Sequence, residues 1–217
     1  MLHQTLKAAI ALAFGALIAN PAVAVPLIPP TTVLGAFIGD DDAQQFEFSI
    51  ASESIVTIET VSYAGGELVG FPGTIVPGGG FDPIISLFDS DGLFITDQDD
   101  GSSNVDAVTG EAFDTFFQPV LAAGTYTVVI TQYDNFFDGS VGDPLSTGFE
   151  VTGDPFFTGI FGCAAGQFCD VAFPSDSRTN RFAINISAEA LAVPEPAALA
   201  LLGFGLVGVG MAYRRRR

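Results

Sequence analysis

The chain has 217 residues, and its formal net charge of −18 at pH 7 reflects 25 acidic side chains against seven basic ones. Residues 25–193 are still more unbalanced: they contain 24 of the acids but only Arg178 and Arg181 of the bases, a formal charge of −22. Such a surface repels phosphate backbones, so nucleic acid is excluded as a main partner. The same residues contain no histidine, which excludes Ser-His-Asp, Cys-His and His-ligated zinc sites.

Residues 1–24 have the pattern of a secretory signal peptide. A short polar start containing Lys7 is followed by an apolar run over residues 8–18 and by the small-residue ending Ala22-Val23-Ala24. The apolar run is too short to span a membrane, and it leads into Pro26, which disfavours a continuing helix. We therefore expect signal peptidase to remove this segment, so that the mature chain starts near Val25.

Residues 197–213 predict a transmembrane helix, because they carry no charged side chain and span about 25 Å at a rise of about 1.5 Å per residue. Four arginines follow directly: Arg214, Arg215, Arg216 and Arg217. Cations at the end of a membrane helix favour the cytoplasmic side. The rest of the chain is therefore predicted to lie outside the inner membrane.

The tail resembles a known sorting signal. Pro194, Glu195 and Pro196, followed by the apolar span and the arginine cluster, are similar to the PEP-CTERM signal of Gram-negative bacteria. The resemblance implies that an exosortase reads these three residues and cleaves the tail. The alternative is a plain membrane anchor with a stiff proline linker. The predicted organisation is a signal peptide (1–24), an exported domain (25–193) and a sorting tail (194–217).

Strand patterns dominate the exported domain. Apolar and polar residues alternate with period two, and glycine and aspartate turns separate the runs. The expected strands cover residues 46–50, 56–59, 84–88, 93–96, 113–117, 125–130 and 182–187. This pattern predicts an all-β fold, an antiparallel β-sandwich, with a closed barrel as the alternative.

Four segments of the domain, residues 40–48, 82–89, 99–101 and 121–128, are similar to the bacterial pre-peptidase C-terminal domain. The resemblance implies a jelly-roll-like sandwich without catalytic activity, and some relatives bind calcium, polysaccharide or protein polymers. PEP-CTERM proteins as a family are associated with extracellular polysaccharide and biofilm matrix. The leading hypothesis is thus a non-enzymatic protein, anchored in the inner membrane before processing and then displayed at the cell surface or released.

One acidic loop is a candidate calcium site. Its possible ligands are Asp97, Asp99, Asp100, Asn104 and Asp106. Calcium takes six to eight hard oxygen ligands, which closely spaced carboxylates supply, although the spacing is not that of an EF-hand. The alternative is a solvated turn whose acids favour turn geometry. A calcium-dependent binding module is accordingly the second hypothesis, and no other cofactor is expected.

Three further expectations concern single features of the domain. Cys163 and Cys169 lie six positions apart, and in an oxidising compartment we expect them to form a disulfide. Residues 40–42, three aspartates before a strand, are expected to shield an edge strand, with cation binding as the alternative. A glycoside hydrolase that uses two of the 24 carboxylates is the third functional hypothesis, although no spacing selects a pair.

Overall fold

The computed structural model describes residues 26–174 and 176–192. The predicted signal peptide, the motif at 194–196, the helix expected over 197–213 and the four terminal arginines all lie outside these residues. Within the part of the chain that is described, no helix is both long enough and apolar enough to cross a membrane.

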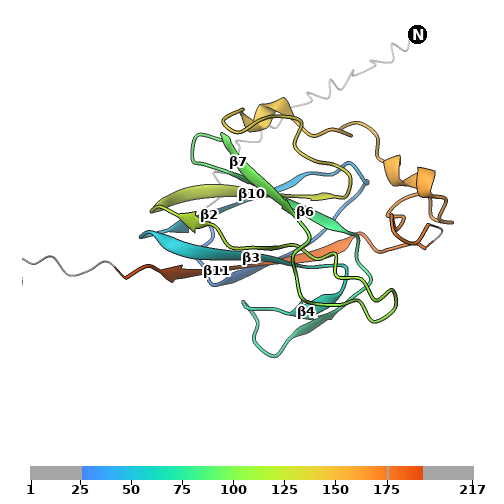
Figure 1. Cartoon of the computed structure of the whole chain (residues 1–217), viewed down its shortest axis with the longest axis horizontal. Helices are drawn as coiled ribbons and strands as arrows, with labels where there is room; N and C mark the ends of the chain where they lie inside the picture. Colours follow the sequence, from blue (N-terminus) through green and yellow to red (C-terminus); the bar gives the residue numbers. More distant parts are fainter. Residues whose placement is uncertain (1–25, 175, 193–217) are drawn as a thin grey trace, which may run out of the picture.

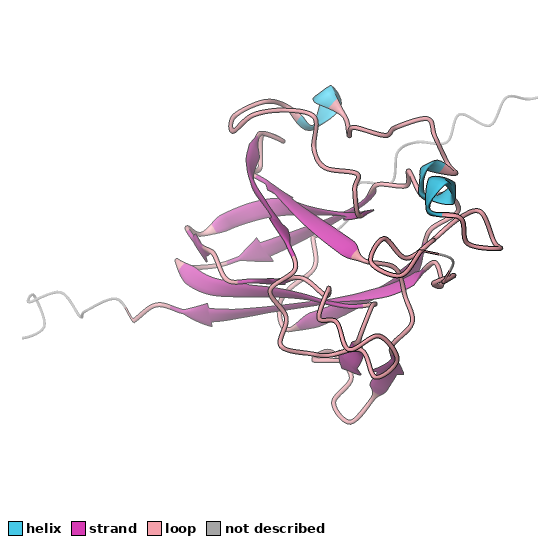
Figure 2. Cartoon of the chain, turned by 45° about the vertical axis from the view of Figure 1, so that its right-hand side comes forward, coloured by secondary structure: helices cyan, strands magenta, loops and turns pink. Residues whose placement is uncertain are grey.

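Two antiparallel sheets stacked face to face form the body of the protein (Figures 1 and 2). The first has the order β1-β11-β3-β8, with β9 also paired to β3, and the second has the order β2-β10-β6-β7. A separate two-stranded sheet joins β4 to β5. The strands are β1 (Thr31–Ala36), β2 (Gln44–Ile50), β3 (Ser54–Val61), β4 (Gly65–Glu67), β5 (Ile75–Pro77), β6 (Pro83–Phe88), β7 (Phe94–Asp99), β8 (Phe116–Phe117), β9 (Val120–Leu121), β10 (Gly124–Gln132) and β11 (Arg181–Ala190).

The observed all-β, antiparallel architecture confirms the predicted fold class. Alternation identified several of the main strands correctly: in β3, Val56 and Ile58 are fully buried while Thr57 between them is partly exposed. The prediction over residues 113–117 was too long, since β8 contains only two residues. Strands β1, β4, β5 and β9 were not predicted, because they are short or rich in glycine and threonine and lack a clear apolar alternation.

Phenylalanine rings fill much of the space between the two sheets. Phe37 stacks on Phe81 with ring centroids 4.6 Å apart, and Phe182 lies 5.3 Å from Phe37 and 6.0 Å from Phe81. These three rings are at most 3% exposed. Because phenylalanine has no polar atom, this core needs no buried hydrogen-bond partner, which explains how a domain without tryptophan packs its interior.

Strand β6 is buried on both faces, unlike the strands of a bare two-layer sandwich. Its outer face, with Phe88, packs against Phe94, Phe137 and Phe149, and the last two come from the long connection between β10 and β11. That connection also carries two short 3-10 helices, η1 (Leu145–Thr147) and η2 (Phe157–Phe161). On the right of Figure 1, this connection forms a loop-rich end of the sandwich, and β11 leads the chain out at the opposite end.

The expected disulfide is present in this loop-rich region. The Sγ atoms of Cys163 and Cys169 are bonded, and the bridge closes the segment that follows η2.

The turn at residues 89–92, between β6 and β7, is a tight hairpin in which the Asp89 N–H donates to the Leu93 carbonyl at 2.9 Å. The connection therefore brings the end of β7 back alongside the start of β6.

Candidate metal centre

Three aspartates meet where β6 begins and β7 ends. Asp82 immediately precedes β6, Asp99 is the last residue of β7, and Asp100 follows it. Because the two strands run antiparallel with Ile84 opposite Asp99, the start of one strand lies beside the end of the other. One carboxylate oxygen from each residue can be chosen so that all three lie within 4.8 Å of one another. Asp100 has a positive φ of 60°, which departs from the strand conformation at this point.

Each of the three aspartates has a buried oxygen without a hydrogen-bond donor. Oδ1 of Asp82, Oδ1 of Asp99 and Oδ1 of Asp100 have no partner within residues 26–174 and 176–192. A buried carboxylate oxygen that accepts no hydrogen bond carries a large desolvation cost. A bound cation would lower that cost by supplying positive charge where the three carboxylates meet.

Burial and mutual repulsion raise the pKa of these groups. Burial, followed by the charges of Asp99 and Asp100, raises the pKa of Asp82 to about 9. Burial, followed by the charge of Asp100, raises the pKa of Asp99 to about 6, and burial also raises the pKa of Asp100. All three shifts have the direction expected for carboxylates gathered without a neutralising cation.

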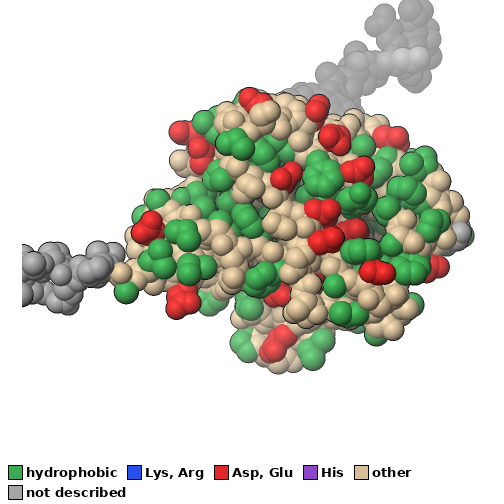
Figure 3. All heavy atoms as spheres, viewed as in Figure 1, with side chains coloured by type: hydrophobic (Ala, Val, Ile, Leu, Met, Phe, Trp, Pro, Cys, Tyr) green, Lys and Arg blue, Asp and Glu red, His purple; other side chains and the backbone are tan. Residues whose placement is uncertain are grey.

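The cluster opens into a cavity of about 230 Å³. Tyr133 and Phe113 contribute aromatic walls, and Val171 and Ala172 contribute apolar ones. Burial raises the pKa of the Tyr133 hydroxyl, and the charges of Asp134 and the three clustered aspartates add to this shift. The cavity is therefore an acidic pocket with apolar sides. Acidic side chains are spread over the face of the domain seen in Figure 3, where no basic side chain is visible.

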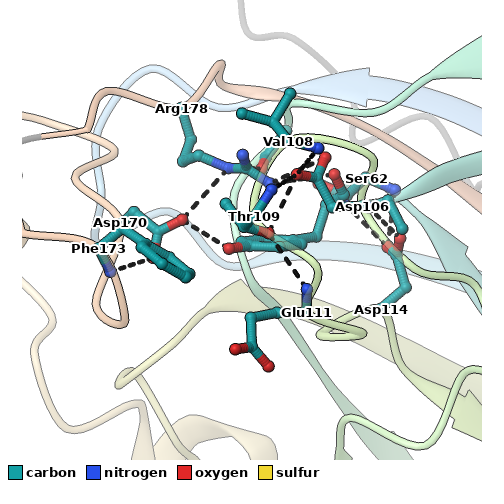
Figure 4. A network of polar contacts seen from close by, with 12 residues as sticks. Ser62, Asp106, Val108, Thr109, Glu111, Asp114, Asp170, Phe173 and Arg178 are labelled. Atoms are coloured by element: carbon teal, nitrogen blue, oxygen red, sulfur yellow. Dashed lines mark hydrogen bonds and ion pairs between the residues drawn. The ribbon is translucent and has the colours of Figure 1, made fainter.

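The nearest buried cation is already engaged by other acids. Arg178 lies 3.6 Å from a carboxylate oxygen of Asp106 and 3.6 Å from one of Asp170, and its guanidinium carbon is 3.6 Å from the centre of the Tyr63 ring (Figure 4). The Tyr63 hydroxyl donates to Asp170 at 2.7 Å. Two carboxylates thus balance this arginine, and it leaves no net positive charge for the aspartate cluster.

This donor set suits a hard divalent cation. All three donors are oxygens, which calcium, magnesium and manganese prefer, whereas zinc sites usually include nitrogen or sulfur. Three protein oxygens are fewer than the six to eight that calcium takes, so waters and carbonyls would complete the shell.

The same aspartates bear on the glycoside hydrolase hypothesis, because a protonated Asp82 beside an ionised carboxylate would resemble an acid–nucleophile pair. The cavity is smaller than the roughly 300 Å³ at which ligand pockets usually begin, which favours an ion over a sugar substrate.

The structure brings together only some of the residues that the sequence predicted as ligands. Asp99 and Asp100 lie in the cluster, whereas Asp97 lies within β7, opposite Ser86. The Asn104 amide donates to Glu59 Oε1 and to the Gly65 carbonyl, both at 3.4 Å. Asp106 faces Arg178, as described above. The structure therefore gathers two of the five predicted ligands and places the other three elsewhere.

Asp82 is the ligand candidate that sequence reasoning missed. It is 17 positions before Asp99, and only the pairing of β6 with β7 brings it near. A usable signal was present, since Asp82 directly precedes a mostly apolar strand and the 89–92 turn predicts that this strand returns antiparallel. Combining the turn with strand lengths would have placed the two ends together.

The expectation that residues 40–42 shield an edge strand is wrong for Asp40. It is 0% exposed, and its carboxylate accepts hydrogen bonds from the Phe168 N–H at 2.8 Å, from the Thr158 N–H at 3.0 Å and from the Thr158 hydroxyl. Burial raises the pKa of Asp40, and these donors oppose the shift. This aspartate is a structural anchor that fixes η2 and the disulfide loop, because no other described group satisfies those N–H donors.

Comparison with known proteins identifies the tail. Residues 192–217 match the PEP-CTERM protein-sorting motif. The match supports an exported protein whose precursor is held in the membrane of a Gram-negative bacterium and sorted by an exosortase. A search of curated proteins found no match to the chain.

Proposed function

We propose that this chain is a non-enzymatic β-sandwich that is displayed on the outside of a Gram-negative cell after exosortase processing and associates with extracellular polysaccharide or biofilm matrix. The observation that carries the proposal is the sorting motif at 192–217, which begins two residues after β11 ends at Ala190. The last strand of the folded domain is thus followed almost directly by the sorting signal, as expected if the tail serves to deliver the domain.

Two features of the body support a binding role over catalysis. Residues 25–193 contain no histidine, so an enzyme built from them would depend on carboxylates for proton transfer. Most of the buried acids that the structure describes are held by neighbours, as with Asp40, Asp106 and Asp170. We also propose that the body is related to the pre-peptidase C-terminal domain, whose strand motifs it resembles.

Mass spectrometry of the C-terminal peptide tests the sorting step. Protein is recovered from the host and compared with a variant carrying Pro194→Ala and Glu195→Ala. We expect cleavage near Pro196 in the natural chain and retention of the arginine tail in the variant. Retention of the tail in both would overturn exosortase processing and leave a membrane-anchored domain. For the matrix role, pull-down of the chain by exopolysaccharide purified from the host is the expected result.

A second candidate function is that of a calcium-dependent binding module, in which bound calcium stabilises the folded domain. The observation that favours it is the convergence of the carboxylates of Asp82, Asp99 and Asp100, each of which also has one buried oxygen without a hydrogen-bond partner among the described residues. An ion that binds only the folded state stabilises it by about 2.7 kcal/mol at a concentration 100 times its Kd.

Thermal unfolding of the full chain in detergent tests this candidate. We expect the Tm to rise in millimolar calcium and to fall back when a chelator is added. The double variant Asp99→Asn, Asp100→Asn should lose the response. Asp91→Asn is the matched control, because Asp91 lies in the exposed hairpin turn beyond the cluster. A Tm that calcium leaves unchanged in the natural chain would eliminate the candidate.

A further inference from the structure

A second, larger cavity lies on the other sheet. It is an open groove of about 610 Å³ between the β4–β5 hairpin, the segment after the disulfide and the start of β11. Its apolar surface includes Ile38, Val76 and Phe168, and its polar surface includes Gln167, Asn180 and Arg181. This volume lies within the range of about 300–1,000 Å³ typical of ligand pockets.

The charge of this groove is opposite to that of the domain. Residues 25–193 contain 24 acids, yet none of them lines the groove, whereas both of their arginines do. Arg178 is 7% exposed and is neutralised by Asp106 and Asp170. Arg181 is exposed, and its guanidinium has no ion-pair or hydrogen-bond partner within residues 26–174 and 176–192. The groove therefore presents a free cation beside a neutral wall.

The polar side chains around Arg181 retain unused hydrogen-bonding atoms. The Asn180 amide donates to the Phe37 carbonyl at 2.6 Å, and the Gln167 amide donates to the Pro155 carbonyl at 2.7 Å. Both side chains are held in place through nitrogen, which leaves their carbonyl oxygens free to accept from a ligand hydroxyl. Thr179, exposed on the same wall, adds a hydroxyl that can donate or accept.

We propose that this groove binds a saccharide that carries carboxylate groups, with Arg181 holding the carboxylate and Asn180, Gln167 and Thr179 bonding the ring hydroxyls. This inference rests on the proposed association with extracellular polysaccharide and names the surface responsible. The planar guanidinium fork of arginine matches a carboxylate bidentately, which a neutral sugar cannot exploit. At physiological salt, charges more than about 8 Å apart are largely screened from one another. The domain's distant acids therefore repel an anionic ligand only weakly, and the charge of Arg181 dominates within the groove.

The position of the groove suits an external ligand. Arg181 is the first residue of β11 and Ala190 the last, so the strand places the groove about 30 Å from the point where the chain leaves toward the sorting tail. The end of β11 that carries Arg181 is thus opposite to the end from which the chain continues toward the sorting tail (Figure 1).

Binding of oligogalacturonate to the full chain in detergent, measured by calorimetry in the presence of chelator, tests the proposal. The chelator removes calcium, which would otherwise bridge the uronate to acidic residues. We expect binding of oligogalacturonate, no binding of a neutral malto-oligosaccharide of equal length, and at least tenfold weaker binding by Arg181→Gln. Arg181→Lys should retain part of the affinity.

Two exposed isoleucines provide a charge-matched pair of variants. Ile38 lines the groove and is 90% exposed, whereas Ile28 is 79% exposed and lies outside it, so neither substitution removes core packing. Ile38→Glu should weaken oligogalacturonate binding, and Ile28→Glu should leave it unchanged.

Equal binding by Arg181→Gln and the natural chain would overturn the proposal, as would equal competition by an acidic peptide. If the chain binds host exopolysaccharide but Arg181→Gln binds it equally, only the groove is wrong; if the chain does not bind it at all, the matrix role fails.

Discussion

Asp114 and the three-aspartate cluster differ in whether their buried carboxylate oxygens accept hydrogen bonds. Asp114 is 0% exposed, and its carboxylate accepts hydrogen bonds from the N–H groups of Ser62 at 2.7 Å, Tyr63 at 3.2 Å and Ala64 at 2.7 Å, and from the Thr60 hydroxyl at 2.9 Å. The cluster at Asp82, Asp99 and Asp100 instead contains three buried oxygens without donors among the described residues. The difference teaches that a buried acid is a sign of function only where the protein leaves it unsatisfied.

Replacement of Asp114 should have the largest effect on stability, because it leaves three backbone N–H donors without an acceptor. We expect Asp114→Ala to lower the free energy of unfolding by about 4 kcal/mol, since each buried donor left unsatisfied costs about 1–3 kcal/mol. Chemical denaturation of the full chain in detergent measures this loss. A change below about 1 kcal/mol would mean that water replaces the carboxylate and that the contrast with the cluster is weaker than the structure indicates.

Asp82→Asn should have the opposite sign in the absence of metal. Because folding raises the pKa of this carboxyl from 3.8 to about 9, the folded state holds a proton that the unfolded state releases. The stability of the natural chain in chelator should therefore fall as pH rises from about 4 toward 9. Asparagine cannot ionise, so the variant should be more stable by about 1–3 kcal/mol at pH 8 and show less pH dependence. Melting curves from pH 5 to pH 9 measure both effects, and a variant that is less stable at every pH would contradict this prediction.

Removal of the disulfide should have an intermediate effect on the free energy of unfolding. Cys163→Ser with Cys169→Ser opens a small loop, so we expect a loss of about 2 kcal/mol by loop entropy. Asp40 holds the same region through Phe168 and Thr158, so the rest of the fold should persist. Denaturation of the natural chain with and without a reductant checks the result. Labelling of both cysteines in native, periplasmically expressed protein would show that the bridge does not form.

Asp97→Asn should give the smallest effect, and it distinguishes the ligand set predicted from the sequence from the three-aspartate cluster. Its carboxylate lies on β7 outside the three-residue cluster, so the Tm increase in calcium should change by less than a quarter of the change caused by Asp99→Asn. Titration of the two variants side by side measures the ratio. Equal losses would favour the ligand set inferred from sequence spacing over one limited to the three-aspartate cluster.

The fold was largely predictable because period-two alternation reports which side of a strand is buried. It located β2, β3, β10 and β11 from their own residues, whereas β6 was predicted as a short apolar run after Pro83 and β7 as a segment between turns. The candidate site was less predictable, since Asp99 and Asp100 are neighbours in sequence but Asp82 joins them only through strand pairing. The groove at Arg181 was not anticipated, because its walls come from segments more than 100 residues apart.

The sequence alone determined the charge of the domain, the absence of histidine, the all-β class and the sorting tail, because each of these depends on composition or on a short contiguous pattern. Only the tertiary structure decided which acids are satisfied and which are not. The distinction between Asp114 and Asp82 depends on donors that lie about 50 residues away in sequence or that are absent from the described part of the chain. Hydrogen-bond satisfaction is a property of neighbours in space, and strand pairing sets those neighbours.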